Sequence, residues 1–231
     1  PKMIQGDCIA CFAITESEAG SDALSATTSA VQDEDGNFIL NGNKIFISNA
    51  PIADMFLVVA KTDINKFTIF AVEKKFAGVE VGPTIHKMGL QSCPFSELIL
   101  KNCKVPKENV VGKVNGGSFI ISAALEWERS FEFAPNVGTM QRIMEQCIKY
   151  SKKRKQSGKS IGKYQGVSHK IAEMRVGIEM ARSLLYKIAW MKDNEMNAYK
   201  ESAIFKFYTS EQYVKTCQDA IRIFGGYGYT T

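Results

Sequence analysis

Three groups of residues in this sequence are of types that can do chemistry. Hydroxyl side chains follow or end predicted strands at Thr15, Ser21 and Ser48, where they could donate hydrogen bonds to a ligand. A basic run over 152–155 ends a predicted helix, and its Arg154 could hold a phosphate in a bidentate fork. The third group is the segment ALEWERSFEFA, which brings two carboxylates close to an arginine in Glu126, Glu128 and Arg129.

Glu128 is the most unusual of these residues, because it lies in an otherwise apolar helical stretch. A carboxylate in such a place is costly unless it is paired, or unless it is kept as a proton acceptor with a raised pKa. Arg129 is the nearest partner in the sequence, although adjacent residues on a helix do not face each other. From the residues alone, a paired structural carboxylate and a general base both remain open.

Several common kinds of site are excluded because their motifs are absent from the sequence. There is no GxGxxG after a strand, no Walker loop, no GxSxG and no HExxH. His86 and His169 are far apart along the chain, so we interpret both as surface or packing residues. Cys8 and Cys11 have the CxxC spacing, but no second pair or histidine follows nearby to complete a metal site. We therefore expect no metal.

The composition indicates where the protein works and what it binds. A net charge of +5, without a basic stripe interleaved with aromatic residues, argues against nucleic-acid binding. No apolar run reaches the roughly 18 residues that a membrane span requires. The six cysteines are scattered, which predicts free thiols in a reducing compartment. We expect the cytoplasm or, in a eukaryote, the mitochondrial matrix.

The elements that must position the candidate residues change in kind after about residue 112. Up to that point, short apolar runs such as KIFISNA, DMFLVVAKT and KFTIFAVEK are separated by Asp-Gly, Asn-Gly, Ala-Gly and Val-Pro pairs. This spacing predicts a compact antiparallel β-sandwich or barrel. The residues at 33–36, Asp-Glu-Asp-Gly, predict a hairpin turn.

After Gly117, apolar residues recur at steps of three and four, as they do on one face of a helix. Similar patterns over 118–152, 165–193 and 197–223 predict three long helices in an up-and-down bundle. The sequence therefore predicts an α+β protein with a central β domain at 1–112 and a helical-bundle domain at 113–231. The clearest apolar face comprises Val167, Ile171, Met174, Ile178, Ala181, Leu185, Ile188 and Met191.

Six motifs, in order along the chain, resemble those of the acyl-CoA dehydrogenase family. AITESEAGSD resembles the family signature of a strand followed by Thr-Glu-Pro and x-Ala-Gly-Ser-Asp. The resemblance covers nearly the whole chain and implies a flavoprotein with N-terminal helical, central β and C-terminal helical domains. We expect the sequence to be part of a longer chain, since it lacks the first domain and the family continues past Thr231. The other motifs are LNGNKIFISNA, HKMGLQSCPFSELILKNCKVPKENVVG, LEWERS, RKQSGKSIGKYQGV and DAIRIFGGYGYTT.

The resemblance implies FAD-binding roles position by position. The Thr15 hydroxyl, with the backbone of Phe12 and Ile14, would donate hydrogen bonds to the polar edge of the isoalloxazine ring and favour its reduced form. Phe46 and Ser48 would cover the opposite side of the ring. Ser21 would lie near the pyrophosphate and the acyl thioester. The residues implied to contact the phosphates or adenosine, across a subunit interface, are Arg154, Gln165, Arg222 and Gly226.

Three positions depart from the family pattern and put the detailed contacts with the cofactor in doubt. Ser17 replaces the proline of the signature, and Glu18 adds negative charge beside it. Ser157 replaces the aromatic residue of the R-x-x-F-G motif, which removes a packing face near the flavin. Arg222 replaces the glutamine of the glycine motif.

The family reaction removes two hydrogens from neighbouring carbons of an acyl thioester. A glutamate takes the α-proton while the β-hydride passes to flavin N5. Isovaleryl- and long-chain-type members carry this glutamate on the first helix of the C-terminal domain, immediately before an arginine, and Glu128 with Arg129 matches that position. Most members carry it beyond the glycine motif, so a structural Glu128 with the base after Thr231 stays open. Ser21, Glu126 and Arg129 are the expected substrate contacts.

Three functions follow from the resemblance. The first is an FAD-dependent acyl-thioester dehydrogenase, a homodimer or homotetramer that passes electrons to an electron-transfer flavoprotein or to oxygen. The second is a dehydrogenase or oxidase of an acyl or aminoacyl group tethered to a carrier protein, because the basic run at 152–155 suits an acidic carrier. The third is a non-catalytic flavin-binding or scaffold homologue.

Overall fold

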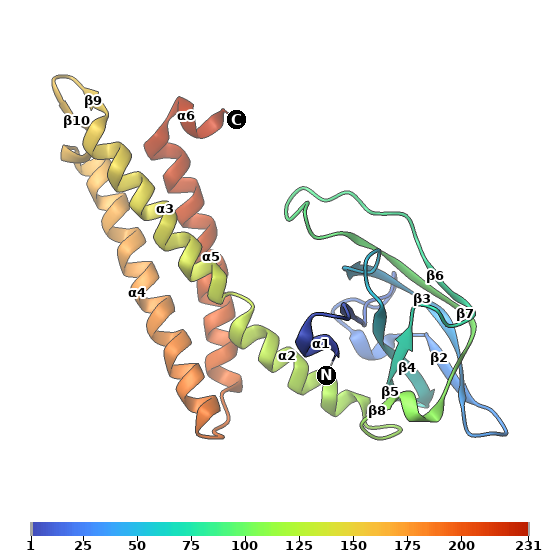
Figure 1. Ribbon diagram of the computed structural model, residues 1–231. Helices are drawn as coiled ribbons and strands as arrows, with labels where there is room; N and C mark the ends of the chain where they lie inside the picture. The colour runs from blue at the N-terminus through green and yellow to red at the C-terminus, as the bar shows by residue number, and fades with distance from the viewer. Residues whose placement is uncertain (1, 231) are drawn as a thin grey trace. The chain divides into compact units, whose positions relative to one another are not determined.

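The computed structural model describes residues 2–230, which form two compact units (Figure 1). The first unit, up to Ser122, contains a short helix, α1 (Lys2–Gln5), and the strands of a large sheet. The second, from Ala123 onward, contains the long helices. The boundary between the units falls inside helix α2 (Gly117–Phe131).

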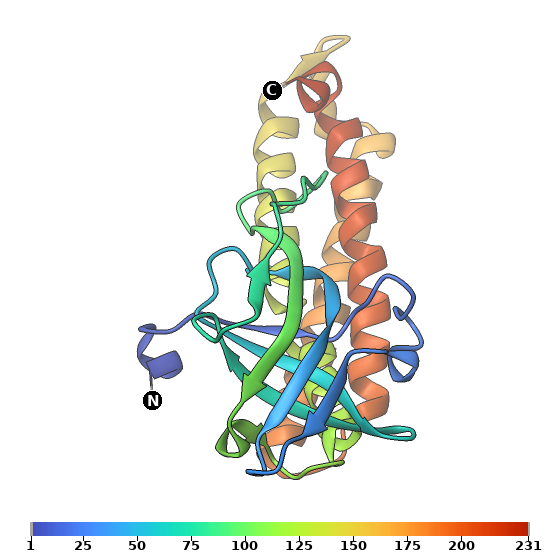
Figure 2. The same ribbon diagram turned by 90° about the vertical axis from the view of Figure 1, so that its right-hand side faces the viewer.

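One eight-stranded sheet forms the first unit, and its strands face the viewer in Figure 2. The strands follow the order β6-β7-β3-β2-β4-β5-β8, and β1 also pairs with β4. Most pairings are antiparallel, as predicted, but β1 and β2 run parallel to β4, which local periodicity cannot reveal. The strands are β1 (Ala10–Ala13), β2 (Ser29–Gln32), β3 (Phe38–Ser48), β4 (Met55–Asp63), β5 (Lys66–Glu73), β6 (Val79–Val81), β7 (Phe95–Val105) and β8 (Val110–Val111).

The predicted hairpin at 33–36 is confirmed between β2 and β3. The Asp33 carboxylate accepts hydrogen bonds from the backbone N–H groups of Asp35 and Asn37, and Gly36 supplies a positive φ of 86°. Beyond the turn, inward-facing residues alternate along the strands as the period of two requires. Those with no more than 2% exposure include Leu40, Ile47, Phe56, Val58, Phe70 and Leu98.

Three long antiparallel helices form the second unit and lie side by side in Figure 1: α3 (Ala134–Lys153), α4 (Gln165–Asp193) and α5 (Tyr199–Phe224). The apolar face predicted for 165–193 is confirmed. Five of its members are buried, at Met174, Ile178, Ala181, Ile188 and Met191, and the other three pack against the same core. Burial of these faces holds the bundle together.

The single helix predicted over 118–152 is wrong, because the chain breaks between α2 and α3 at Glu132 and Phe133. Pro135 occupies the first turn of α3 and has no N–H to donate to a carbonyl one turn earlier. Its ring also restricts the residue before it. A helix can start at such a position but cannot pass smoothly through it.

The helix ends beside the candidate residues are well defined. Gly225 ends α5 with a φ of 60°, which a residue with a side chain rarely adopts, and the short helix α6 (Gly226–Tyr229) follows. After α3, strands β9 (Lys155–Gln156) and β10 (Lys159–Ser160) form a small hairpin. Its two turn residues, Ser157 and Gly158, both have positive φ. Within residues 2–230, no helix combines the length and the hydropathy needed to cross a bilayer.

Candidate functional site

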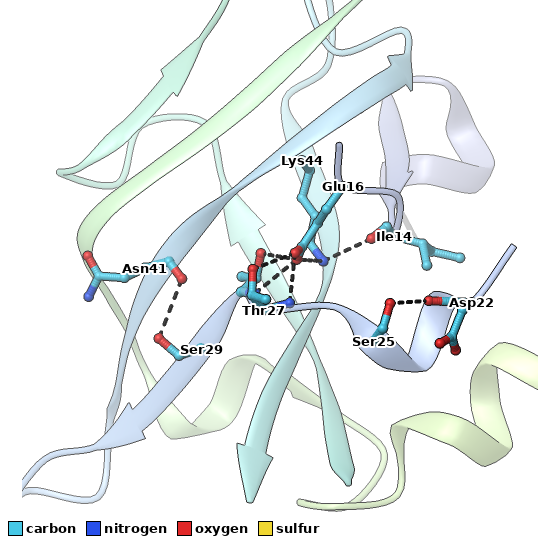
Figure 3. Close-up of polar contacts among 9 residues, drawn as sticks. Ile14, Glu16, Asp22, Ser25, Thr27, Ser29, Asn41 and Lys44 are labelled. Carbon is cyan, nitrogen blue, oxygen red and sulfur yellow. Dashed lines mark hydrogen bonds and ion pairs between the residues drawn. The ribbon is translucent and has the colours of Figure 1, made fainter. Parts of the chain in front are cut away.

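The carboxylate of Glu16 lies at the centre of a buried polar network in the first unit (Figure 3). Its Oε2 accepts hydrogen bonds from the N–H and the hydroxyl of Thr27, at 2.7 and 2.8 Å. Its Oε1 accepts from the N–H and the hydroxyl of Thr28, at 2.9 and 2.5 Å, and from Lys44 Nζ at 2.9 Å. Five donors therefore satisfy a side chain that is only 7% exposed.

Lys44 supplies the opposite charge from β3, where its side chain is fully buried. The same ammonium group donates to the carbonyl of Ile14 at 2.9 Å (Figure 3). Gly42, two residues earlier, allows Thr28 to approach, since an added Cβ would lie 2.3 Å from the Thr28 hydroxyl oxygen. The network thus joins three separate segments of the chain.

This network makes the stability of the protein sensitive to acid. Burial alone would raise the pKa of Glu16, but hydrogen bonds from Thr28, Thr27 and Lys44 outweigh it and lower the pKa to about 2. An unfolded glutamate titrates near ~4.3, so the stabilisation of the folded protein by ionised Glu16 is complete above about pH 5. It is lost as the pH falls towards the pKa of Glu16 in the folded protein. At 1.36 kcal/mol per pKa unit, the loss is about 3 kcal/mol. Urea unfolding at pH 7 to 2.5 should show a shallower acid loss for Glu16→Gln than for wild type; equal slopes would contradict this assignment.

Thr15 and Phe46, two of the predicted cofactor residues, lie on segments that are joined by a backbone hydrogen bond. The N–H of Ile45 donates to the carbonyl of Thr15 at 2.9 Å, which places the segment after β1 against β3. Phe46 has a φ of 62° at an irregularity of the β3–β7 pairing, and its side chain is 53% exposed. Its ring stacks on Phe95, with centroids 5.5 Å apart and planes 13° apart. A bulky residue held at positive φ with an exposed ring is an indication of function.

The other predicted cofactor residues of the first unit lie near this pair along the chain. Phe12 is in β1, Ile14 follows it, and both are half-buried. Ser48 ends β3 and is exposed. Ser21 lies in the exposed loop after the turn formed by Glu16 and Ala19, and no hydrogen bond within residues 2–230 fixes its side chain.

In the second unit, an open pocket of about 680 Å³ gathers three of the four predicted phosphate and adenosine contacts. Arg154 comes from the end of α3, Arg222 from the last turn of α5, and Gly226 from the start of α6. Gln165 begins α4 beside Tyr164, which lines the pocket, but Gln165 itself does not. Among the described residues no carboxylate lines it, and its aromatic residues are Tyr150, Tyr164, Phe224 and Tyr227. The pocket therefore suits an anionic ligand with a planar group.

Arg222 is held in place by a buried carboxylate. Asp219, whose side chain is 3% exposed, accepts from Arg222 at 3.0 Å, Lys170 at 2.9 Å and Lys215 at 3.3 Å. Burial would raise the pKa of Asp219, but these three cations lower it overall. The carboxylate of Asp219 thus binds three cations, which leaves an excess of positive charge beside the pocket.

The three candidate residues of the segment ALEWERSFEFA have different surroundings in the structure. Glu126 is paired with Lys192 in a partly buried ion pair, and Arg129 lies over the ring of Tyr199 at 5.9 Å. Glu128 is exposed, which corrects the expectation of a buried carboxylate, and within residues 2–230 its carboxylate has no hydrogen bond or ion pair, with Arg129 or otherwise. Partial burial of the carboxyl and the negative charge of Glu132 raise the pKa of Glu128.

Sequence reasoning missed the network around Glu16 and the aromatic lining of the pocket. One signal was available: Lys44 occupies an inward-facing position of its strand, and a buried lysine requires a carboxylate nearby. Nothing local indicates that Thr27 and Thr28 complete the shell of that carboxylate. Of the aromatic residues of the pocket, Tyr150 lies outside the quoted motifs, and Phe224 lies inside DAIRIFGGYGYTT, where the resemblance assigns a role only to Arg222 and Gly226.

Known protein families match nearly the whole chain. The family model described as acyl-CoA dehydrogenase, middle domain, matches residues 11–103, and the one described as the C-terminal domain matches residues 115–231. The chain is 42% identical over 231 residues to the caffeyl-CoA reductase-Etf complex subunit CarC of Acetobacterium woodii, covering 98% of this chain and 61% of that protein.

Two solved structures are also similar. The crystal structure of the prolyl acyl carrier protein oxidase AnaB matches with a TM-score of 0.97 and 41% identity, covering all of this chain and 62% of that one. The FAD complex of PigA matches with a TM-score of 0.96 and 37% identity, covering 99% and 61%. This chain therefore spans somewhat less than two thirds of the length of its relatives. Together with the motifs and the two-unit fold, these matches show that the chain belongs to the acyl-CoA dehydrogenase family.

Proposed function

We propose that the protein is an FAD-dependent dehydrogenase that converts an acyl thioester into its α,β-unsaturated form. The observation that carries the proposal is the hydrogen bond from the Ile45 N–H to the Thr15 carbonyl, which places Thr15 against the segment of β3 that carries Phe46. There the exposed ring of Phe46 stacks on Phe95, and the segment that carries the Thr15 donors lies beside it. A flat heteroaromatic ring needs these two kinds of contact. The similarity to the FAD complex of PigA supports the choice of flavin.

The pocket of the second unit suits the phosphate and adenosine part of an FAD molecule, which the resemblance assigns to contacts across a subunit interface. Arg154 and Arg222 could each hold a phosphate oxygen pair, and the glycines at 225 and 226 keep the backbone accessible. The tyrosine rings of the lining suit an adenine. Bound FAD would supply the two-electron acceptor that the reaction requires.

Glu128 is the residue that we propose as the base for the α-proton. Its carboxylate has no partner among the described residues, in contrast to Glu126, whose pairing with Lys192 occupies it. A raised pKa makes Glu128 a stronger base than an ordinary glutamate. Arg129 and Ser21 remain the proposed contacts with substrate. Glu126 is a weaker candidate for such a contact, because its carboxylate is already paired with Lys192.

The proposal is tested by the colour and the redox behaviour of the intact protein. Purified without denaturant, it should be yellow, and its flavin absorbance should bleach anaerobically when an acyl-CoA is added. Buffer and the free thiol are the controls. A protein that holds no flavin and has no affinity for added FAD would refute the function. A yellow protein that no acyl thioester bleaches would be the non-catalytic homologue.

A second candidate, oxidation of a carrier-tethered group, is favoured by a specific similarity. AnaB is a prolyl acyl carrier protein oxidase and matches this chain at 41% identity. The residues from 146 to 172 contain no Asp or Glu but eight Lys or Arg, so this end of the bundle is strongly basic and suits an acidic carrier. Bleaching by a carrier-bound acyl or aminoacyl group, but not by its CoA ester, would select this function.

The partners that we propose follow from the relatives. The similarity to a subunit of a reductase-Etf complex favours an electron-transfer flavoprotein as the acceptor, with oxygen as the alternative. Exposed apolar residues on the bundle, such as Phe207 and Trp190, are consistent with a homodimer or homotetramer. Sedimentation of the intact protein would measure this directly.

A further inference from the structure

We propose that Glu16 and Lys44 are positioning residues that aim the hydrogen-bond donors of Thr15 at the edge of the flavin. This inference rests on the proposed function, because it assigns a purpose to the flavin-facing segment. It concerns residues that hold the segment around Thr15 and that are not themselves proposed to contact the cofactor. Its starting point is that Lys44 makes two contacts, one with Glu16 Oε1 and one with the Ile14 carbonyl, each at 2.9 Å (Figure 3).

The contact with Ile14 sets the direction of the next N–H group. In a trans peptide, the carbonyl oxygen of one residue and the N–H of the following residue point to opposite sides, and no described peptide of this chain is cis. Because Lys44 holds the Ile14 oxygen on the side of β3, the Thr15 N–H must point away from Lys44. The direction of this donor is therefore determined by the ammonium group of Lys44.

The peptide on the other side of Thr15 is held as well. The Thr15 carbonyl accepts from Ile45 at 2.9 Å, and the Glu16 N–H donates to Ala19 at 3.0 Å. Within residues 2–230, the N–H and the hydroxyl of Thr15 have no hydrogen-bond partner, although the residue is half-buried. Thr15 thus lies between two peptides that are each held by hydrogen bonds, and it presents two free donors. This is the arrangement expected of a preorganised site.

Stability alone does not explain why a charged pair is buried here. Replacing a buried ion pair with apolar residues of similar volume is often neutral or stabilising. An apolar side chain at position 44 could fill the core but could not bind the Ile14 carbonyl. The role of Glu16 is to keep that ammonium group charged and in place, and the threonines at 27 and 28 fix Glu16 in turn.

The experiment compares the intact protein with Lys44→Met, with the double variant Glu16→Gln/Lys44→Met and with a control, Thr68→Val. The double variant removes the contact with Ile14 without leaving an unpaired buried charge. It should therefore fold even if Lys44→Met alone is too unstable to fold. Thr68 is a buried threonine of β5, whose neighbours are β4 and β8, and its hydroxyl bonds to Thr62 and Asn115. The flavin reduction potential, the Kd for FAD and the amide hydrogen exchange of Ile45, whose N–H donates to the Thr15 carbonyl, are measured, the last in flavin-free protein.

A hydrogen bond to the reduced ring favours reduction, so both Lys44 variants should have a lower potential. A single misaligned hydrogen bond corresponds to a roughly three- to tenfold smaller equilibrium constant for reduction, and tenfold is about 30 mV for a two-electron couple. The Kd for FAD should rise by a similar factor, and the Ile45 amide, which donates to the Thr15 carbonyl, should exchange faster. Thr68→Val should lose stability with its potential unchanged.

The outcomes separate this inference from the function on which it rests. If the wild type binds no flavin, the proposed function is wrong and the positioning role is wrong with it. If the wild type is a flavoprotein and the double variant has the wild-type potential, Kd and Ile45 amide exchange, the positioning role alone is overturned. A purely structural pair predicts that stability and potential recover together in the double variant. Our proposal predicts that only stability recovers.

Discussion

Replacing Glu128 with glutamine is expected to slow anaerobic flavin reduction by about 10²- to 10⁴-fold, the usual contribution of a general base. Glutamine has nearly the same shape but cannot accept the α-proton at any useful pH. Since the side chain is exposed and has no partner among the described residues, the substitution should leave folding and FAD content unchanged. Stopped-flow absorbance with an acyl thioester measures the rate, and the absorbance spectrum measures the flavin content.

Glu132→Gln is the matched control, because Glu132 is also exposed and lies one helical turn further on. Its negative charge is one cause of the raised pKa of Glu128, after partial burial. The control should therefore keep the reduction rate within a few-fold while moving the acid limb of the pH–rate profile to lower pH. An unchanged rate in Glu128→Gln would make Glu128 a structural carboxylate and place the base elsewhere.

Replacing Lys44 with methionine is expected to lower the free energy of unfolding by about 3–5 kcal/mol, the cost of breaking a buried ion pair on one side. Methionine fills most of the volume of the lysine, so the loss comes from the charge left on Glu16, a side chain with 7% exposure. Urea unfolding at pH 7, followed by circular dichroism, measures the change.

A double-mutant cycle isolates the pair from its surroundings. Glu16→Gln alone should be destabilised by a similar amount, because it leaves the fully buried ammonium of Lys44 without its counter-charge. The double variant should then be less destabilised than the sum of the singles by about 2–3 kcal/mol. Additive losses would mean that the two charges do not interact in the folded protein. The acid sensitivity of Glu16 should disappear in both variants that lack its carboxylate.

These expectations differ in what they require of the cofactor. The stability cycle at Glu16 and Lys44 can be read without flavin, because both residues lie within one unit and contact only the chain. The effect of Glu128→Gln requires bound FAD and a substrate. If the double-mutant cycle shows the expected coupling but no flavin is reduced, the buried ion pair is confirmed and the proposed activity is refuted.

The division into a sheet and a bundle, and most of the faces that each element buries, can be read from the sequence alone. The positions from Met174 to Met191 in α4 illustrate this, because helical burial repeats at a local spacing that can be read without knowing the partner. The family motifs also located Thr15, Phe46, Arg154 and Arg222. The break at Pro135 was readable from the proline, although the continuous apolar pattern around it obscured the break.

Which polar groups meet is seen only in the folded chain. Glu16 is satisfied by Thr27, Thr28 and Lys44 from different segments, and the pocket draws Arg154 and Arg222 from opposite ends of the bundle sequence. The positive φ of Phe46 and the absence of a partner for Glu128 within residues 2–230 belong to the same class of facts. Periodicity reports whether a residue is buried, because burial depends on the spacing within one element. The partner of a buried charge depends on how distant segments close upon each other, and no local pattern contains that information.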